Sequence, residues 1–299
     1  MKLYDVVGLG YACIDYLGTV PHIPENNTKL DLGGLTIQGG GPVATALVAL
    51  ARLGARTLFL GKLGDDDFGR RILDGLHDEK VAAEVLVTPG ASSPFAFVMV
   101  TPDGDRTVLW TRGSVPFLAP TEVDGEMVRS GRYLLVDDIE IKAGIEAARL
   151  ARAAGIPVVL DAGTPRAGIE DLIRLTDILV TSEKFPFRLT GERDYGNSLR
   201  ALQKMGPAEV TATLGEQGCI HLGPEGLIEQ PGFAVDARDT TGAGDVFHGA
   251  YVYSLLQEWP IRQRLRFSCA VAALQTRKLG GRAAIPSLDE ALAFMNSWT

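Results

Sequence analysis

Short apolar runs recur along the chain, and longer stretches with helical spacing separate them. The runs are rich in β-branched residues and are apolar on both faces of an extended strand. Strands with two apolar faces are typical of parallel sheets that helices cover on both sides. The pattern therefore predicts six buried strands, over residues 5–8, 57–60, 133–136, 158–160, 178–180 and 210–213.

Helices are predicted between these strands. Three Ala- and Leu-containing segments with helical spacing each end directly before a glycine, which is a common helix stop signal. These segments are 42–53, 143–154 and 197–205. Because strands and helices alternate over most of the chain, we predict an α/β fold in which a mostly parallel sheet lies between helices.

Two segments, 15–38 and 93–112, interrupt the alternation. The second contains two short alternating runs, 95–100 and 107–110, around the turn Pro102-Asp-Gly-Asp105. An Asp-Gly turn between alternating runs is a strong hairpin signal. We expect these segments to form a small second sheet attached to a single large domain that spans residues 1–299.

The composition narrows the choice of partners and compartment. The chain carries 29 Lys and Arg against 37 Asp and Glu, so its net charge is −8. An acidic chain is a poor candidate for nucleic-acid binding, which needs clustered basic residues. Its three cysteines lack metal-ligand spacing, no apolar run is long enough to span a bilayer, and the N-terminus lacks a signal-peptide core. We expect a cytoplasmic protein that binds neither nucleic acid nor membranes.

The segment Asp239-Thr-Thr-Gly-Ala-Gly-Asp245 precedes a clear helical pattern. Small residues at a helix start let an anion approach free backbone N–H groups at the positive end of the helix dipole. A carboxylate beside such a site would repel a bound phosphate. Asp245 is therefore better suited to act as a general base, which takes a proton from a hydroxyl that attacks the phosphate. A helix cap is the plainer alternative for Asp239 or Asp245.

The segment DTTGAGDVFHGA closely resembles the second signature of the ribokinase-like (PfkB) carbohydrate kinases. Other matches to this family follow in order along nearly the whole chain: Gly39-Gly-Gly-Pro-Val-Ala-Thr-Ala46, Gly61-Lys-Leu-Gly-Asp-Asp-Asp-Phe-Gly69, Thr213-Leu-Gly-Glu-Gln-Gly218 and Thr276-Arg-Lys. The first segment and Gly280-Gly-Arg-Ala-Ala-Ile-Pro286 also resemble the sulfofructose kinase branch. The resemblance implies the ribokinase-like fold, in which segments 15–38 and 93–112 form a β lid over the sugar.

The resemblance also implies roles for individual residues. Asp245 would be the catalytic base, and the backbone of Gly242, Ala243 and Gly244 would form the anion hole for the transferred phosphoryl group. Asp15 would accept hydrogen bonds from neighbouring sugar hydroxyls. The remaining residues assigned to the sugar are Gly39, Gly40, Gly41, Thr45, Arg112 and Asp138.

The family uses ATP with Mg²⁺, and many members also bind a monovalent cation such as K⁺. Here Asp239 and Thr241 would hold that cation. The residues implied at the nucleotide are Ser182, Glu183, Thr213, Gly215, Gly218, Ser268 and Gly281.

Several positions depart from the family pattern. Ala44, with Thr45 next to it, replaces an Asn that usually helps to hold the sugar. The Asn-x-x-Glu motif that organises Mg²⁺ is absent, because Ser182 and Phe185 occupy its two positions. Glu183 or a water would then take over its role. Ser268 stands where some relatives carry an Asn near the adenine.

The substrate remains open at this point. Asp138 follows strand 133–136 and would lie at the edge of the sheet where ligands of α/β folds bind. An acid there favours a neutral, hydroxyl-rich substrate. A sulfonate or phosphate would need a basic cluster, and the candidates in the predicted lid are Lys29, Arg106 and Arg112. We predict an ATP-dependent kinase that phosphorylates a primary hydroxyl of a small-molecule sugar. The alternatives are a nucleoside kinase of the same fold and a non-catalytic sugar- or nucleotide-binding protein. Exposed lid strands would also favour a homodimer.

Overall fold

A computed structural model describes residues 2–298, and one nine-stranded sheet runs through the body of the protein. The sheet has the order β13-β12-β11-β10-β9-β8-β1-β4-β5. All neighbours are parallel except β11 with β12 and β12 with β13. The strands are β1 (Tyr4–Leu9), β4 (Thr57–Gly64), β5 (Ala82–Thr88), β8 (Gly131–Asp137), β9 (Val158–Ala162), β10 (Ile178–Thr181), β11 (Glu209–Thr213), β12 (Cys219–Gly223) and β13 (Gly226–Gln230).

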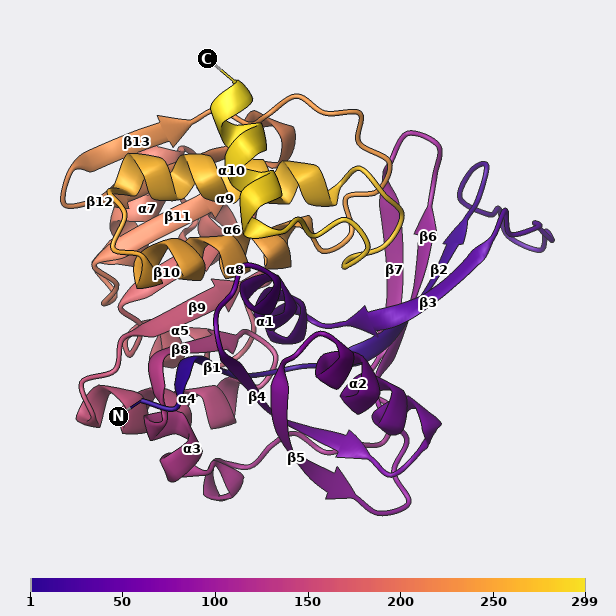
Figure 1. The fold of residues 1–299 in the computed structure, drawn as a ribbon, viewed down its shortest axis with the longest axis horizontal. Coiled ribbons are helices and arrows are strands. Elements are labelled where there is room, and N and C mark those ends of the chain that lie inside the picture. Colours follow the sequence, from indigo (N-terminus) through magenta and orange to yellow (C-terminus); the bar gives the residue numbers. More distant parts are fainter. Residues whose placement is uncertain (1, 299) are drawn as a thin grey trace.

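Helices cover both faces of this sheet (Figure 1). Successive residues of one strand point to opposite faces, so Val6 packs into one core cluster and Val7 into another. The first cluster contains α1 (Pro42–Arg52), α2 (Asp67–Asp78), α8 (Ala243–Leu256), α9 (Ile261–Gln275) and α10 (Leu288–Ser297). The second contains α3 (Gly125–Arg129), α4 (Ile141–Ala153), α5 (Ile169–Ile173), α6 (Phe185–Thr190) and α7 (Tyr195–Gln203).

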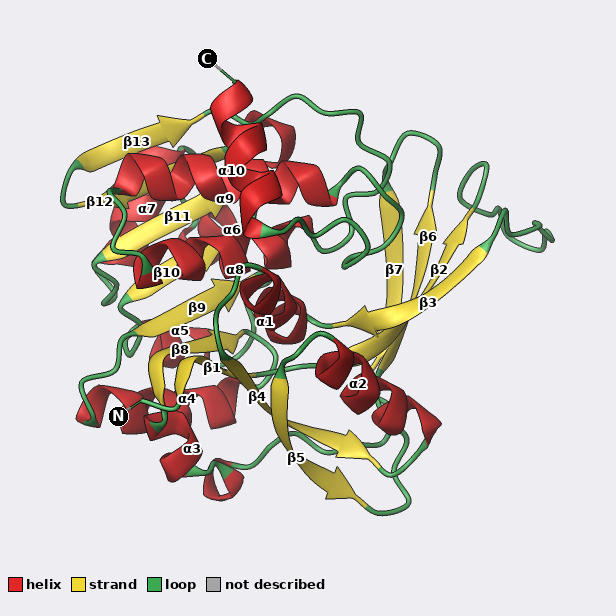
Figure 2. Cartoon of the chain, in the orientation of Figure 1, coloured by secondary structure: helices red, strands yellow, loops and turns green. Residues whose placement is uncertain are grey.

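A separate four-stranded sheet projects from the body (Figure 2). We call it the lid; its order is β3 (Leu35–Gly40), β2 (Cys13–Thr19), β6 (Phe95–Val100) and β7 (Arg106–Thr111). The face that includes Leu17, Ala96 and Val98 is buried and packs against Leu279. The other face carries a row of apolar side chains in register across all four strands: Ile37, Tyr16, Phe97 and Leu109.

The six predicted strands are all present, and so are the three predicted helices and the hairpin in 93–112. The pattern did not predict β5, β12 or β13. These strands lie at the two ends of the main sheet, where β5 alternates between half-buried and exposed positions and lacks a continuous apolar run. Within residues 2–298, no helix has the length and apolar character that crossing a membrane requires.

Candidate active site

The N-terminus of α8 is preceded by a sharp turn at Gly242, whose φ of 72° lies in the left-handed region. A side chain here would also meet the backbone of the loop after α9, because its Cβ would lie 2.7 Å from the Gly281 carbonyl oxygen. Only glycine meets both requirements without strain. The turn therefore fixes how α8 begins, and it brings Gly281 to the start of this helix.

The turn leaves backbone donors free. The N–H of Ala243 donates to the Thr240 carbonyl over 3.3 Å, whereas the N–H groups of Gly242 and Gly244 have no backbone partner among residues 2–298. Free N–H groups at the positive end of a 14-residue helix attract an anion. Two of the three predicted anion-hole donors are therefore unengaged, and the third makes one long bond.

Asp245 lies in the first turn of α8. The pKa of its carboxyl is raised to about 6, because burial and the nearby carboxylate of Asp15 outweigh the opposing charges of Arg106 and Arg282. A carboxylate with a pKa near 6 is ionised at neutral pH and is a stronger base than an ordinary Asp. This position suits the predicted role of a general base.

Asp15 lies on β2, and its carboxylate packs directly against the backbone of Gly40 on β3. It is 7% exposed and accepts a bond from the Cys13 thiol over 3.2 Å. Burial raises its pKa, which the charge of Arg282 partly offsets. A side chain at Gly40 would displace this carboxylate, so the glycine at this position has a direct structural reason.

Arg282 is a site residue that the sequence did not predict. Its guanidinium is buried and donates to the Gly40 carbonyl over 3.1 Å and to the Thr45 hydroxyl over 3.2 Å. It also fills the space that a side chain at Gly39 would need. Thr45, predicted to bind sugar, thus has a protein partner here. The glycines of Gly280-Gly-Arg282 could have drawn attention to this arginine, but its hydrogen-bond partners Gly40 and Thr45 lie far away in the sequence.

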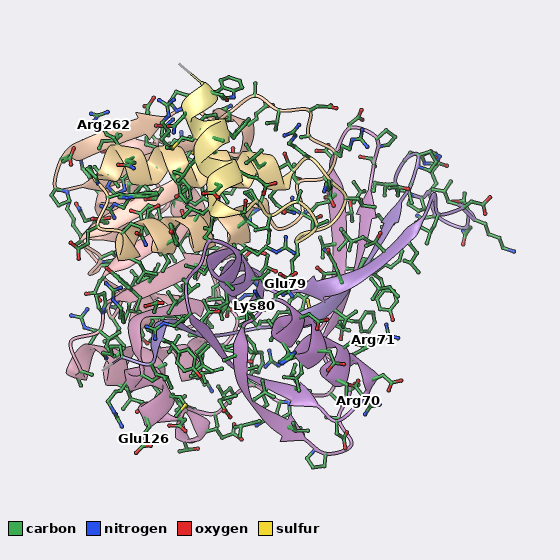
Figure 3. The ribbon with its side chains drawn as sticks, in the orientation of Figure 1. Arg70, Arg71, Glu79, Lys80, Glu126 and Arg262 are labelled. Atoms are coloured by element: carbon green, nitrogen blue, oxygen red, sulfur yellow. The ribbon has the colours of Figure 1, made fainter. Side chains whose placement is uncertain are left out.

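The loop that carries Arg282 is clamped from the other side by Arg52 at the end of α1. Arg52 donates to the carbonyl oxygens of Arg282 and Ile285 over 2.9 and 3.1 Å. It also forms an ion pair with Glu79 at 2.5 Å, and Glu79 follows α2 beside α1 (Figure 3). The position of the buried cation beside Asp15 therefore depends on two helices and is rigidly set.

Two carboxylates that follow β8 are paired with arginines. Asp138 accepts from the Thr164 N–H at 2.5 Å and lies 3.7 Å from the Arg166 guanidinium. Glu140 forms an ion pair with Arg112. Burial raises the pKa of Asp138, and Arg166 lowers it. Asp138 and Glu140 thus each have an arginine partner, and Arg112 has a protein partner. Asp137 and Asp161 at the same strand ends are buried, and burial raises the pKa of both carboxyls.

Asp239 is fully buried and fixes the start of segment 239–245, which leads into α8. Its carboxylate accepts from the N–H groups of Thr241 and Gly280 at 2.8 and 2.7 Å. The hydroxyl oxygen of Thr241 is buried and has no hydrogen-bond partner within the described part of the chain. A buried polar atom without a partner is costly. An oxygen-liganded cation beside these two residues would relieve that cost.

The residues predicted at the nucleotide fall into two groups. Thr213, Gly215 and Gly218 lie on the end of β11 and the turn after it, and Ser182 and Glu183 follow the neighbouring strand β10. These strand ends share one edge of the sheet. Ser268 differs, because it is fully buried in α9 and its hydroxyl donates to the Arg264 carbonyl at 2.8 Å.

The lid also brings Arg106 to the site, a residue that the sequence offered only as a basic candidate for an anionic substrate. Arg106 begins β7, and its guanidinium reaches the Thr240 backbone and hydroxyl in segment 239–245. Among the charged groups near Asp245, Arg106 has the largest effect on the pKa of its carboxyl, and it lowers that pKa. The hairpin itself was predicted, but its contact with a turn 134 residues away was not.

Residues 4–288 match the pfkB family of carbohydrate kinases. Fructokinase-2 of Solanum lycopersicum is 30% identical to this chain, and the alignment covers 97% of this chain and 95% of that protein. Ribokinase of Haemophilus influenzae is 28% identical, with 96% of this chain and 97% of that protein covered.

Solved structures share the same architecture. Arabidopsis thaliana ribokinase, solved with ribose and ATP, superposes with a TM-score of 0.84 at 25% identity and with 98% of both chains covered. The match extends over both the main sheet and the lid, so the fold is ribokinase-like, with a mostly parallel sheet, flanking helices and a small separate lid sheet.

Proposed function

Because this chain belongs to the pfkB family of carbohydrate kinases, we propose that it transfers the γ-phosphate of ATP to a primary hydroxyl of a neutral sugar. One observation carries the proposal. The Asp245 carboxylate, with its pKa raised to about 6, lies in the same helical turn as the free N–H of Gly244. A base and an anion site side by side are what phosphoryl transfer to a hydroxyl needs.

In the proposed reaction, Asp245 takes the proton of the acceptor hydroxyl as the hydroxyl oxygen attacks the γ-phosphorus in line. The new O–P bond forms as the bond between the γ-phosphorus and the β,γ-bridging oxygen breaks, and ADP leaves with that bonding electron pair. The N–H groups of Gly242 and Gly244 donate to the transferring phosphoryl group. Asp245 then releases its proton to solvent.

The acceptor site favours neutral sugars. Asp15 can only accept hydrogen bonds, so it suits the hydroxyl donors of a diol and repels an anionic group. The fructokinase and ribokinase relatives point to ketohexoses and pentoses as the first candidates. A nucleoside kinase would need a large aromatic clamp in the lid. Phe95, however, packs against Phe68 of α2, and of Phe95, Phe97 and Trp110 only Trp110 lies on the face of Asp15.

The function is tested by measuring ADP release with Mg-ATP across hexoses, ketoses, pentoses, sugar acids, sugar phosphates and nucleosides. We expect turnover on a neutral sugar. Turnover confined to nucleosides or to anionic sugars would contradict the substrate class but not the kinase reaction. Binding of ligands without ADP release would contradict the kinase reaction itself.

Magnesium would enter with the ATP phosphates. Within the described residues, no group of three or more His, Cys, Asp or Glu side chains could hold a metal ion. This fits Mg²⁺, which is commonly bound by one or two protein groups together with phosphates and waters. We propose Glu183, with Ser182 beside it, as the protein side of that site. The bound ion would supply positive charge that neutralises the transferring phosphoryl group.

A monovalent cation site at Asp239 and Thr241 makes a testable prediction. The unpartnered Thr241 hydroxyl oxygen and the buried Asp239 carboxylate would both face the ion. Replacing K⁺ by a tetraalkylammonium ion should therefore lower kcat severalfold, and added KCl should restore it. A Thr241→Val variant should lose most of that response. Steady-state rates that are independent of the cation in both proteins would contradict this site.

We propose that the lid face that carries Ile37, Tyr16, Phe97 and Leu109 pairs with a second copy of this chain. Leu109 and Ile37, in register on the two edge strands, are 60% and 41% exposed. Exposed apolar edges are usually covered or paired. We expect a dimer in sedimentation velocity and a monomer for Leu109→Asp, with Leu227→Asp on β13 as the matched control. A wild-type monomer at micromolar concentration would contradict the pairing.

A further inference from the structure

The tip of the lid hairpin is bound to the turn that carries the catalytic base. The Arg106 guanidinium donates to the Thr240 carbonyl over 3.1 Å and to its hydroxyl oxygen over 2.7 Å. In return, the Thr240 hydroxyl lies 3.4 Å from the carbonyl of Gly104 in the hairpin turn. The lid thus contacts the loop between Asp239 and Asp245 directly.

Arg106 also differs from Arg282, the other arginine that lowers the pKa of Asp245, in the part of the protein that positions it. Arg282, the second cation, is buried in the loop after α9, where it binds Gly40 at the end of lid strand β3 and Thr45 of α1. Arg106 is solvent-exposed and begins a strand of a sheet that stands apart from the body. Its charge is therefore placed beside the base by the lid alone. The charged groups that face Asp245 are Arg106 from the hairpin, Asp15 from β2, Arg282 from the loop after α9, Asp138 after β8 and Asp161 on β9.

We propose that Arg106 is a positioning residue that couples the lid to the catalytic base: by binding Thr240 it holds segment 239–245 and places a positive charge beside Asp245 when the lid covers the sugar. This inference rests on the proposed kinase function and deepens it. Neither hydrogen bond involves the substrate, so Arg106 acts through the turn and through its field.

The coupling has a chemical consequence. Three of the other four charged groups around Asp245 are carboxylates, and like charges together with burial favour its protonated form. Arg106 opposes them, and its loss should raise the pKa of Asp245 above about 6. A protonated carboxyl cannot accept the proton of the sugar hydroxyl. The fold loss of activity should therefore grow as the pH falls through 6 and should be smallest above pH 8.

The test compares pH profiles of kcat/KM for the wild type, Arg106→Gln and Arg106→Lys. If the pKa of the base rises by about one in Arg106→Gln, its ionised fraction falls about fivefold at pH 6 and hardly at all at pH 8.5. We expect the acidic limb of the profile to move to higher pH by that amount. Arg106→Lys, which keeps the charge but not the fork geometry, should restore much of the limb.

Two controls keep the result interpretable. Lys29→Gln removes one exposed lid charge that has no ion pair in the described part of the chain, and it should leave the profile unchanged. Thr240→Ala keeps the Arg106 charge but removes one of its two acceptors, so it should shift the limb less than Arg106→Gln. An Arg106→Gln effect that is equal at pH 6 and pH 8.5, or absent, would overturn the inference. Absence of turnover in the wild type would instead count against the proposed function.

Discussion

Replacing Asp245 by Asn should lower kcat by about two to four orders of magnitude, the range that a positioned general base contributes. The amide keeps the size and the hydrogen-bonding reach of the carboxylate but cannot take a proton. The acidic limb of the pH profile near 6, which we attribute to this group, should disappear with the activity. Initial rates of ADP release with the best sugar, measured from pH 5 to pH 9, check both expectations.

Stability provides the control for this variant. The folded-state pKa of Asp245, about 6, lies above its ordinary value of 3.8, so this group costs the folded protein stability progressively as the pH rises from about 3.8 to 6, and the full cost is present above 6. The neutral amide removes that effect. Asp245→Asn should therefore melt at the same or a higher temperature than the wild type at pH 8. A variant that retains more than a tenth of wild-type kcat would contradict the role of Asp245 as base.

The second large effect is expected at Gly242. An alanine there would adopt a left-handed conformation at φ near 72° and would press its Cβ against the Gly281 carbonyl oxygen. Relief of that contact must move the first N–H groups of α8. Loss of one aligned oxyanion donor in other enzymes lowers kcat by about 10²- to 10³-fold, and we expect a loss of that size.

Gly155→Ala is the matched control for this substitution. Gly155 follows α4, has a φ of 68°, and leaves open space where its Cβ would be. It therefore carries the same backbone strain without the contact or the anion site. Thermal melting should show a modest loss for Gly155→Ala and a larger one for Gly242→Ala, which adds the contact with the Gly281 backbone. Only Gly242→Ala should lose catalysis. Equal kcat in the two variants would contradict the anion-hole assignment.

The architecture was predictable wherever the sequence carries a local signal. Runs that are apolar on both faces identified the central strands, and the Asp-Gly turn identified the lid hairpin. The end strands β5 and β13 were missed because they are largely exposed or half-buried and lack such runs. β12 is buried, but its short apolar run is interrupted by His221. Segment 239–245 was predictable because its signal is local: small residues, a helix start and an acid all lie within seven consecutive positions.

The remaining site residues depend on contacts between distant segments. Arg282 lies beside Asp15 only because β3 and α1 offer it Gly40 and Thr45, 242 and 237 positions away. Arg106 reaches Thr240 only because the lid returns to the body. The role of a charged residue depends on the groups around it. For Arg282 and Arg106 those groups come from distant segments that only the tertiary fold brings together.

Phosphorus NMR of one reaction with the preferred sugar tests directly whether phosphate is transferred to a primary hydroxyl. We expect ADP and a new phosphomonoester to appear in equal amounts, with the ester signal split by two protons of an adjacent CH₂ group. A ligand-stabilised protein that forms neither product would contradict this expectation. An ester signal split by a single proton would show that a secondary hydroxyl is the acceptor instead.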